Sequence, residues 1–126
     1  MDSADSYFKQ GRLRVDPATF AIVKARKPIE DAWALVQDHR EMTVIVDEQK
    51  LGSVDAIQTD KGWRLITFEV TMPFEVVGFL ARVSGALAEE KIPIFAVSSY
   101  STDHILVKEE NLEKAVKKLG RLGFKI

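Results

Sequence analysis

Two short segments hold the residue types whose spacing suits the binding of a small ligand. The first runs Phe74-Glu75-Val76-Val77-Gly78-Phe79 and opens a predicted helix. The first N–H groups of a helix have no partner within it, and together with the helix dipole they can hold a carboxylate. Gly78 would let a ligand approach the backbone closely. The negative charge of Glu75 would oppose a bound carboxylate unless this side chain points outward or pairs with a ligand amine.

The second segment is the predicted turn Ser98-Ser99-Tyr100-Ser101-Thr102-Asp103, which is rich in turn-forming residues. The hydroxyl groups of Ser98, Ser99 and Thr102 can donate or accept hydrogen bonds, and the carboxylate of Asp103 is the candidate partner for an α-amino group. The same side chains commonly do no more than satisfy the amides of their own turn. Both interpretations stay open at this point.

Catalytic and metal-binding chemistry finds little support in the sequence. The chain has two histidines and no cysteine, and His39 lies in the charged connection Asp38-His39-Arg40-Glu41. Two isolated histidines without cysteine do not form a metal site, and His104 is interpreted as a hairpin residue with a hydrogen-bond partner. The nucleophile elbow, the P-loop and the dinucleotide fingerprint are all missing. We therefore predict no catalytic residue, no metal, no cofactor and no enzymatic activity.

The elements that position the two segments are clearest from Trp63 to Ile126. Strand residues alternate in character, and Phe79, Leu80, Val83 and Leu87 recur at helical spacing. The order is β-α-β-β-α-β, a ferredoxin-like α+β arrangement with the helices on one face of an antiparallel sheet. The predicted strands are Trp63–Val70, Ile94–Ser98, His104–Val107 and Phe124–Ile126, and the predicted helices are Val76–Glu90 and Asn111–Leu119.

The N-terminal half is interpreted as a shortened copy of the same unit, β-α-β-β. A turn at Asp60-Lys61-Gly62 would separate residues 1–60 from residues 61–126, and Met1–Ser6 is expected to be frayed. Pro28 suits the first position of a helix that would run to Val36. The predicted strands are Leu13–Val15, Phe20–Lys24, Thr43–Asp47 and Val54–Ile57.

From Trp63 onward the chain resembles the ACT domain family. The resemblance rests on Pro73-Phe74-Glu75-Val76-Val77-Gly78-Phe79-Leu80, which matches the family's strand-to-helix turn, and on the hairpin from Ile94 to Val107. It implies two ACT-like halves, a degenerate one at residues 1–60 and an ACT domain at residues 61–126. It also implies an amino acid bound where the first strand meets the first helix. Relatives commonly carry Asp at the position of Ser101.

The composition of the chain limits the classes of partner that we expect it to bind. The chain has 126 residues, a net charge of −1 and no concentrated basic block, so nucleic acid is not an expected partner. No apolar run approaches the roughly 20 residues that span a bilayer, and the chain starts without a signal peptide, so a cytoplasmic location is expected. The predicted function is a homodimeric amino-acid sensor that regulates an enzyme. The alternative is a ligand-free ACT-fold module for interaction or dimerisation.

Overall fold

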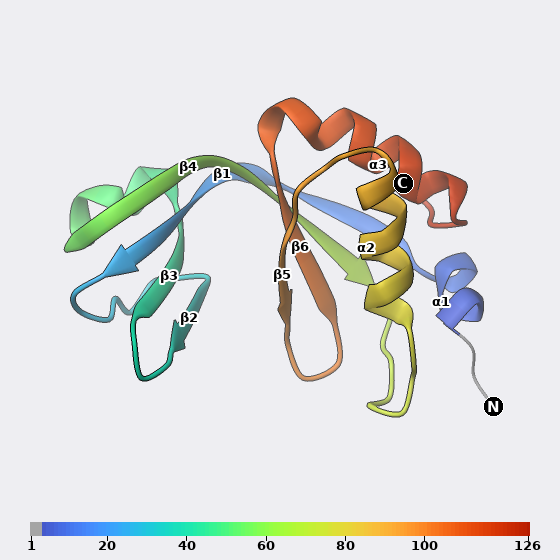
Figure 1. Ribbon diagram of the computed structural model, residues 1–126, viewed down its shortest axis with the longest axis horizontal. Helices are drawn as coiled ribbons and strands as arrows, with labels where there is room; N and C mark the ends of the chain where they lie inside the picture. Colours follow the sequence, from blue (N-terminus) through green and yellow to red (C-terminus); the bar gives the residue numbers. More distant parts are fainter. Residues whose placement is uncertain (1–3) are drawn as a thin grey trace. The chain divides into compact units, whose positions relative to one another are not determined.

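The computed structural model describes residues 4–126, which form two compact units. Unit 1 combines the N-terminal residues up to Asp16 with Leu65–Ile126, and unit 2 is Pro17–Arg64. The long strands β1 (Arg12–Ala25) and β4 (Ala56–Glu69) contribute residues to both units (Figure 1). Neighbouring strands are hydrogen-bonded in the order β2-β3-β1-β4-β6-β5. These units differ in extent from the predicted halves, because the N-terminal residues join the C-terminal unit.

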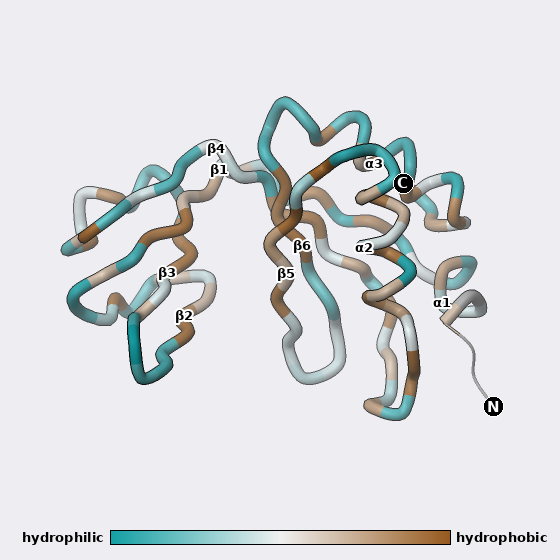
Figure 2. The backbone as a smooth tube through the Cα atoms, in the orientation of Figure 1, coloured by the Kyte–Doolittle hydropathy of each residue, from teal (hydrophilic) through white to brown (hydrophobic). Residues whose placement is uncertain are grey.

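The predicted elements of the C-terminal half are present in the structure, except the final strand at Phe124–Ile126. The strand β4 leads to helix α2 (Phe79–Glu89), and the hairpin of β5 (Phe95–Ser98) and β6 (Asp103–Lys108) leads through a short 3-10 turn to helix α3 (Leu112–Arg121). The two hairpin strands are antiparallel, with Ser98 opposite Asp103. In Figure 2 β5 and the part of β6 away from the turn are coloured hydrophobic, whereas the turn and the start of β6 are not. The buried residues of the hairpin are Ile105, Leu106 and Val107 of β6.

Alternation along the strands decides which side chains face the helices. Ile66 and Phe68 of β4, and Ile105 and Val107 of β6, belong to one core cluster with Val83 of α2 and with residues of α3. This cluster holds side chains of every helix of unit 1, so the helices cover one face of its strands. Thr67 and His104 lie at the alternate positions and meet on the opposite face, where their side chains are hydrogen-bonded.

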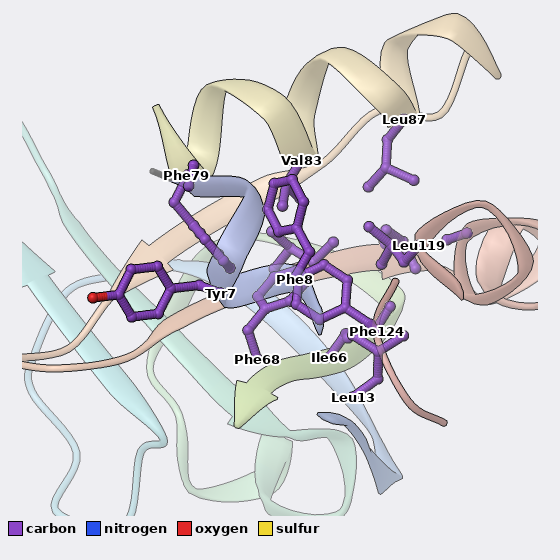
Figure 3. Close-up of a cluster of buried hydrophobic side chains, with 14 of the residues drawn as sticks. Tyr7, Phe8, Leu13, Ile66, Phe68, Phe79, Val83, Leu87, Leu119 and Phe124 are labelled. Atoms are coloured by element: carbon purple, nitrogen blue, oxygen red, sulfur yellow. The ribbon is translucent and has the colours of Figure 1, made fainter. Parts of the chain in front are cut away.

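Four phenylalanine rings form the centre of the core of unit 1 (Figure 3). Phe8, Phe68, Phe79 and Phe124 come from α1 (Ala4–Gln10), β4, α2 and the C-terminal segment. Their ring centroids lie 5.1–5.9 Å apart in five pairs, within the range in which tilted and edge-to-face rings attract. The cluster therefore joins segments that are far apart in the sequence.

Helix α1 corrects the expected fraying at the N-terminus. Met1–Ser3 lie outside the described residues, but Ala4–Ser6 belong to α1. Tyr7 and Phe8 are buried, and the Arg82 guanidinium of α2 lies 5.6 Å from the centre of the Phe8 ring, as in a cation–π contact. The sequence of this short segment shows no helical periodicity of apolar residues, because its two buried aromatic residues, Tyr7 and Phe8, are adjacent.

The predicted final strand at Phe124–Ile126 is also corrected. The structure has only an isolated parallel bridge between Lys125 and Arg12, closed by hydrogen bonds from the Leu13 amide to the Lys125 carbonyl and from the Lys125 amide to the Gly11 carbonyl. The segment contributes chiefly by burying Phe124, which is 4% exposed.

In unit 2, a strand begins within the segment that the sequence predicted to be a helix. β3 (Met42–Asp47) pairs in antiparallel fashion with β1 and with β2 (Ala34–Gln37), and the 3-10 helix η1 (Glu48–Ser53) precedes β4. The helix predicted for Pro28–Val36 is therefore wrong. An isolated helix of this length is marginal in water, whereas pairing with β3 satisfies the backbone of β2. The Trp33 amide already donates to the Ile45 carbonyl at 2.8 Å.

The turn predicted at Asp60-Lys61-Gly62 is also wrong, because β4 continues through it. Gly62 has φ +84° within the strand, a conformation that other residues rarely adopt. Its amide donates to the Glu48 carboxylate at 2.7 Å, and the Trp63 indole donates to the Asp60 carboxylate at 2.9 Å. The glycine therefore marks a local irregularity in a long strand.

Truncating the ring of Phe8 tests whether α1 is part of the core. We expect Phe8→Ala to lower the free energy of unfolding by about 3–5 kcal/mol, because a large buried ring leaves a cavity. Phe74→Ala is the matched control: its ring is 71% exposed, against 1% for Phe8, so its effect should stay within about 0.5 kcal/mol. Urea unfolding measures both, and equal midpoints would show that α1 does not pack on the core.

Replacing Gly62 by alanine tests the left-handed residue of β4. We expect Gly62→Ala to destabilise the protein by about 1–2 kcal/mol through backbone strain alone, because a Cβ there would meet nothing within 4 Å. Gly52→Ala in η1 is the control, since that position is equally open but has no positive φ. Thermal unfolding of the two variants should differ, and a Gly62→Ala protein as stable as Gly52→Ala would contradict the assigned conformation.

Candidate functional site

A pocket of about 190 Å³ lies in unit 1 between the loop that precedes α2 and the turn that joins β5 to β6. Figure 1 shows this loop and this turn at the same end of the unit. The two segments singled out from the sequence are therefore brought together by the fold. The lining residues are Met72, Pro73, Phe74, Val76, Phe79, Ser98, Ser99, Tyr100, Ser101, Thr102 and Asp103.

Most of the predicted site residues line this pocket, and three do not. The predicted residues in the lining are Phe74, Val76, Phe79, Ser98, Ser99, Thr102 and Asp103. Glu75, Val77 and Gly78 are not among the lining residues. Sequence reasoning omitted Met72, Pro73, Tyr100 and Ser101, although each adjoins a residue that it did select. Taking each segment as a continuous wall would have found them.

Gly78 has a conformational role. Its φ of +86° places it in the left-handed region, directly before the first residue of α2. A Cβ at this position would meet nothing within 4 Å, so neither close helix packing nor a close approach by the protein's own chain explains the glycine. The positive φ does, because it turns the chain sharply into the helix.

The start of α2 offers backbone amides near the pocket. The first backbone hydrogen bond of the helix runs from the Arg82 amide to the Gly78 carbonyl at 3.0 Å, and Gly78 supplies no side-chain cap. The amides that precede Arg82 in the first turn therefore have no acceptor one turn back. Phe79, the first helical residue, lines the pocket and is itself buried in the aromatic core. The core thus fixes where these amides lie.

The β5–β6 turn is held by its own hydroxyl groups. The Ser99 amide and hydroxyl both donate to the Thr102 carbonyl, at 2.9 and 3.0 Å. The Ser98 hydroxyl donates to Asp103 Oδ1 at 2.6 Å. The Met72 amide donates to the Ser101 carbonyl at 3.2 Å, which ties the turn to the loop across the pocket. The pocket walls are therefore cross-linked before any ligand arrives.

Asp103 places one carboxylate in the pocket wall. Its side chain is partly buried, and the Ser98 hydroxyl is the donor to one of its oxygens. An ionised carboxylate has about four acceptor positions, so capacity remains for a ligand amine. Among residues 4–126, no Lys, Arg or His side chain belongs to the lining. The pocket therefore carries a net negative charge.

Two exposed aromatic rings meet at this pocket. The centroids of Phe74 and Tyr100 lie 4.8 Å apart with an interplanar angle of 63°, although the residues are 71% and 81% exposed. Both residues line the pocket. Exposed aromatic pairs are unusual on a protein without a partner and commonly mark a binding surface.

His104 links the turn to β4 on the sheet face opposite the helices. Its Nδ1 lies 2.9 Å from Thr67 Oγ1 and its Nε2 lies 3.1 Å from Ser99 Oγ, so both ring nitrogens have partners, as predicted. Burial lowers the pKa of His104 below 6.5, and the nearby Asp103 carboxylate partly opposes this shift. His104 is therefore mainly neutral at neutral pH. Among the side chains that the structure describes, no group of three or more from His, Cys, Asp or Glu is arranged to hold a metal.

The sequence from residue 58 to residue 121 matches the model of the ACT domain, which is more than half of the chain. This chain belongs to the ACT domain family. The matched range contains both walls of the pocket and all of α2, β5 and β6. No curated protein has a significant sequence match to the chain. Among the described residues, no helix has both the length and the apolar character needed to cross a membrane.

Solved structures share the fold across nearly the whole chain. A protein from Agobacterium tumefaciens has a TM-score of 0.75 at 24% identity, covering 91% of this chain and 90% of that one. A protein of unknown function from Vibrio cholerae, described as a possible transport protein, has a TM-score of 0.76 at 20% identity and covers 94% of each chain. The ligand-free regulatory subunit of aspartate kinase from Thermus thermophilus has a TM-score of 0.66 at 12% identity, covering 92% and 97%. At these identities the likeness establishes the fold alone.

The pH dependence of stability tests the buried position of His104. Because its pKa is lowered in the folded state, the unfolded chain binds the proton more readily, and stability should fall as the pH drops below 6.5. We expect His104→Gln to lose less thermal stability than the wild type between pH 7.5 and 5.5. His39→Gln, at an exposed position, should keep the wild-type dependence. Identical pH profiles for wild type and His104→Gln would contradict the assignment.

Proposed function

We propose that this ACT protein binds a free amino acid in the pocket between the loop before α2 and the β5–β6 turn, and that binding regulates a partner. The observation that carries the proposal is the convergence of both wall segments on one pocket, whose lining includes the Asp103 carboxylate and Phe79, the first residue of α2. Family membership supports a regulatory role in place of a catalytic one.

The chemistry of the pocket suits a zwitterion. Asp103 would accept hydrogen bonds from an α-ammonium group, and the hydroxyl groups of Ser98, Ser99 and Thr102 lie on the same wall. The first amides of α2 would receive the α-carboxylate with help from the helix dipole. Pockets for drug-sized ligands have volumes of roughly 300–1,000 Å³. A pocket of about 190 Å³ therefore fits a smaller solute.

We further propose a cytoplasmic homodimer that acts on an enzyme. Among the described residues, the outermost strands in the hydrogen-bonding order are β2 and β5, and an edge strand can add a strand of another chain. Leu35 and Val36 of β2 are 40% and 50% exposed, which suits contact with a second copy. The interpretation of residues 1–60 as a degenerate ACT-like half belongs to the same proposal.

The alternative is a ligand-free ACT module that serves interaction or dimerisation. It is favoured by the exposure of Phe74, Val77 and Tyr100, because a protein surface could cover these side chains as well as a small molecule could. In that case the pocket would be a by-product of the family fold.

A thermal-shift screen against the individual amino acids separates the two functions. A ligand present at about 100 times its Kd should stabilise the folded protein by roughly 2.7 kcal/mol and raise its Tm accordingly. We expect at least one amino acid at millimolar concentration to do so. If none shifts the Tm while the protein sediments as a dimer, the interaction module is the better account.

Neutralising Asp103 tests the site itself. We expect Asp103→Asn to weaken binding of the amino acid found in the screen by about tenfold or more, because a charged hydrogen bond to the ammonium group is lost. The fold should survive, since the amide can still accept from Ser98. Glu113→Gln on α3 removes the same charge at a highly exposed position outside the pocket lining and should bind normally. Calorimetric titration measures all three proteins, and unchanged affinity in Asp103→Asn would remove Asp103 from the site.

A further inference from the structure

Two further hollows adjoin the pocket and share its walls. One is lined by Thr71, Met72, Pro73, Phe74, Glu75, Tyr100 and Ser101, and has five of these residues in common with the pocket. The other is lined by Thr67, Glu69, Val70, Thr71, Ser99, Thr102 and His104, and shares Ser99 and Thr102 with it. The pocket and the two hollows are therefore immediate neighbours that share lining residues.

The charged side chains that line these three neighbouring spaces have one sign. The pocket contributes Asp103, and the adjoining hollows contribute Glu75 and Glu69. Among residues 4–126, no Lys or Arg side chain lines any of the three, and burial keeps His104 mainly neutral at neutral pH by lowering its pKa. An anionic ligand side chain would meet a carboxylate in either hollow and would be repelled there.

The wall between the pocket and the Glu75 hollow is aromatic. Phe74 and Tyr100 line both spaces, and their rings contact each other at 4.8 Å. The faces of aromatic rings attract cations, and a desolvated cation gains more from them than an exposed one. A ligand side chain that reached from the pocket to Glu75 would lie against these two rings.

We propose that the site selects an amino acid whose side chain is cationic, and that Glu75 together with the Phe74–Tyr100 pair determines this selectivity. The inference rests on the proposed amino-acid function and names the ligand class. The α-ammonium group lies at Asp103, the aliphatic part of the side chain crosses Phe74 and Tyr100, and the terminal cation lies in the hollow that contains Glu75. Glu75 therefore serves the ligand from outside the pocket lining, where its charge does not oppose the α-carboxylate.

Ligands matched in length but not in charge test the proposal. Lysine, norleucine and glutamate would be titrated separately into the wild-type protein by calorimetry at low salt. We expect lysine to bind at least about tenfold more tightly than norleucine, as an ion pair combined with a cation–π contact allows. Glutamate should bind more weakly than either. The preference for lysine should shrink at high salt, because exposed charges are screened.

Replacing Glu75 or Glu69 by glutamine tests which carboxylate determines the preference for lysine. We expect Glu75→Gln to weaken lysine binding about threefold or more and to leave norleucine binding unchanged, because only the cation contacts this hollow. Glu69→Gln is the matched control, since it removes the same charge from the other hollow and should keep the preference for lysine. Tyr100→Leu keeps an apolar wall but loses the ring, and it should also reduce the preference for lysine over norleucine.

The possible outcomes distinguish a failure of the proposed selectivity from a failure of the proposed amino-acid binding. Lysine preference that is lost in Glu75→Gln and kept in Glu69→Gln supports the inference. Norleucine or glutamate binding as tightly as lysine overturns it and leaves amino-acid binding intact. A preference that survives in Glu75→Gln overturns the role of Glu75. No heat and no Tm shift with any amino acid overturns the proposed function, and the inference with it.

Discussion

The burial of Phe79 is the constraint on which the rest of unit 1 depends. Its ring contacts Phe8, Phe68 and Phe124, so a single side chain joins the first helix of the described chain, the central strand and the C-terminal segment. It is also the first residue of α2 and lines the pocket. Fixing this ring fixes where the helix begins, and the first residue of the helix lies at one wall of the pocket.

The second wall is fixed by hydrogen bonds. The turn between β5 and β6 closes on itself through Ser99 and Thr102, and the Met72 amide binds it to the loop before α2. A pocket whose two walls are rigid in this way loses little entropy when a ligand enters. The charge pattern then decides what enters, because the walls offer carboxylates, hydroxyls and aromatic rings but no cationic side chain among residues 4–126.

Prediction from sequence succeeded where neighbouring residues carry the information. The alternation of Ile66 and Phe68 in β4 was read correctly, as were the helical spacing of Val83 and Leu87 and the turn chemistry of the hairpin, because each pattern depends on residues a few positions apart. Prediction failed at Pro28–Val36, where residues 28–33 form no helix and Ala34–Val36 belong to β2, which pairs with β3. It also missed α1, since the site that buries Phe8 is assembled from distant segments.

The sequence alone determined the ACT character of the C-terminal half and the two segments that could hold a ligand. Only the tertiary structure decided that these segments share one pocket. It also decided that Gly78 turns the chain into α2 but does not line the pocket, and that Glu75 lines an adjoining hollow. It also decided that the last residues bury Phe124 and form only one bridge with β1. The physical reason is that periodicity and turn chemistry act over a few residues. Where a side chain points in a loop, and which strand pairs with which, depends on contacts between residues far apart in the chain.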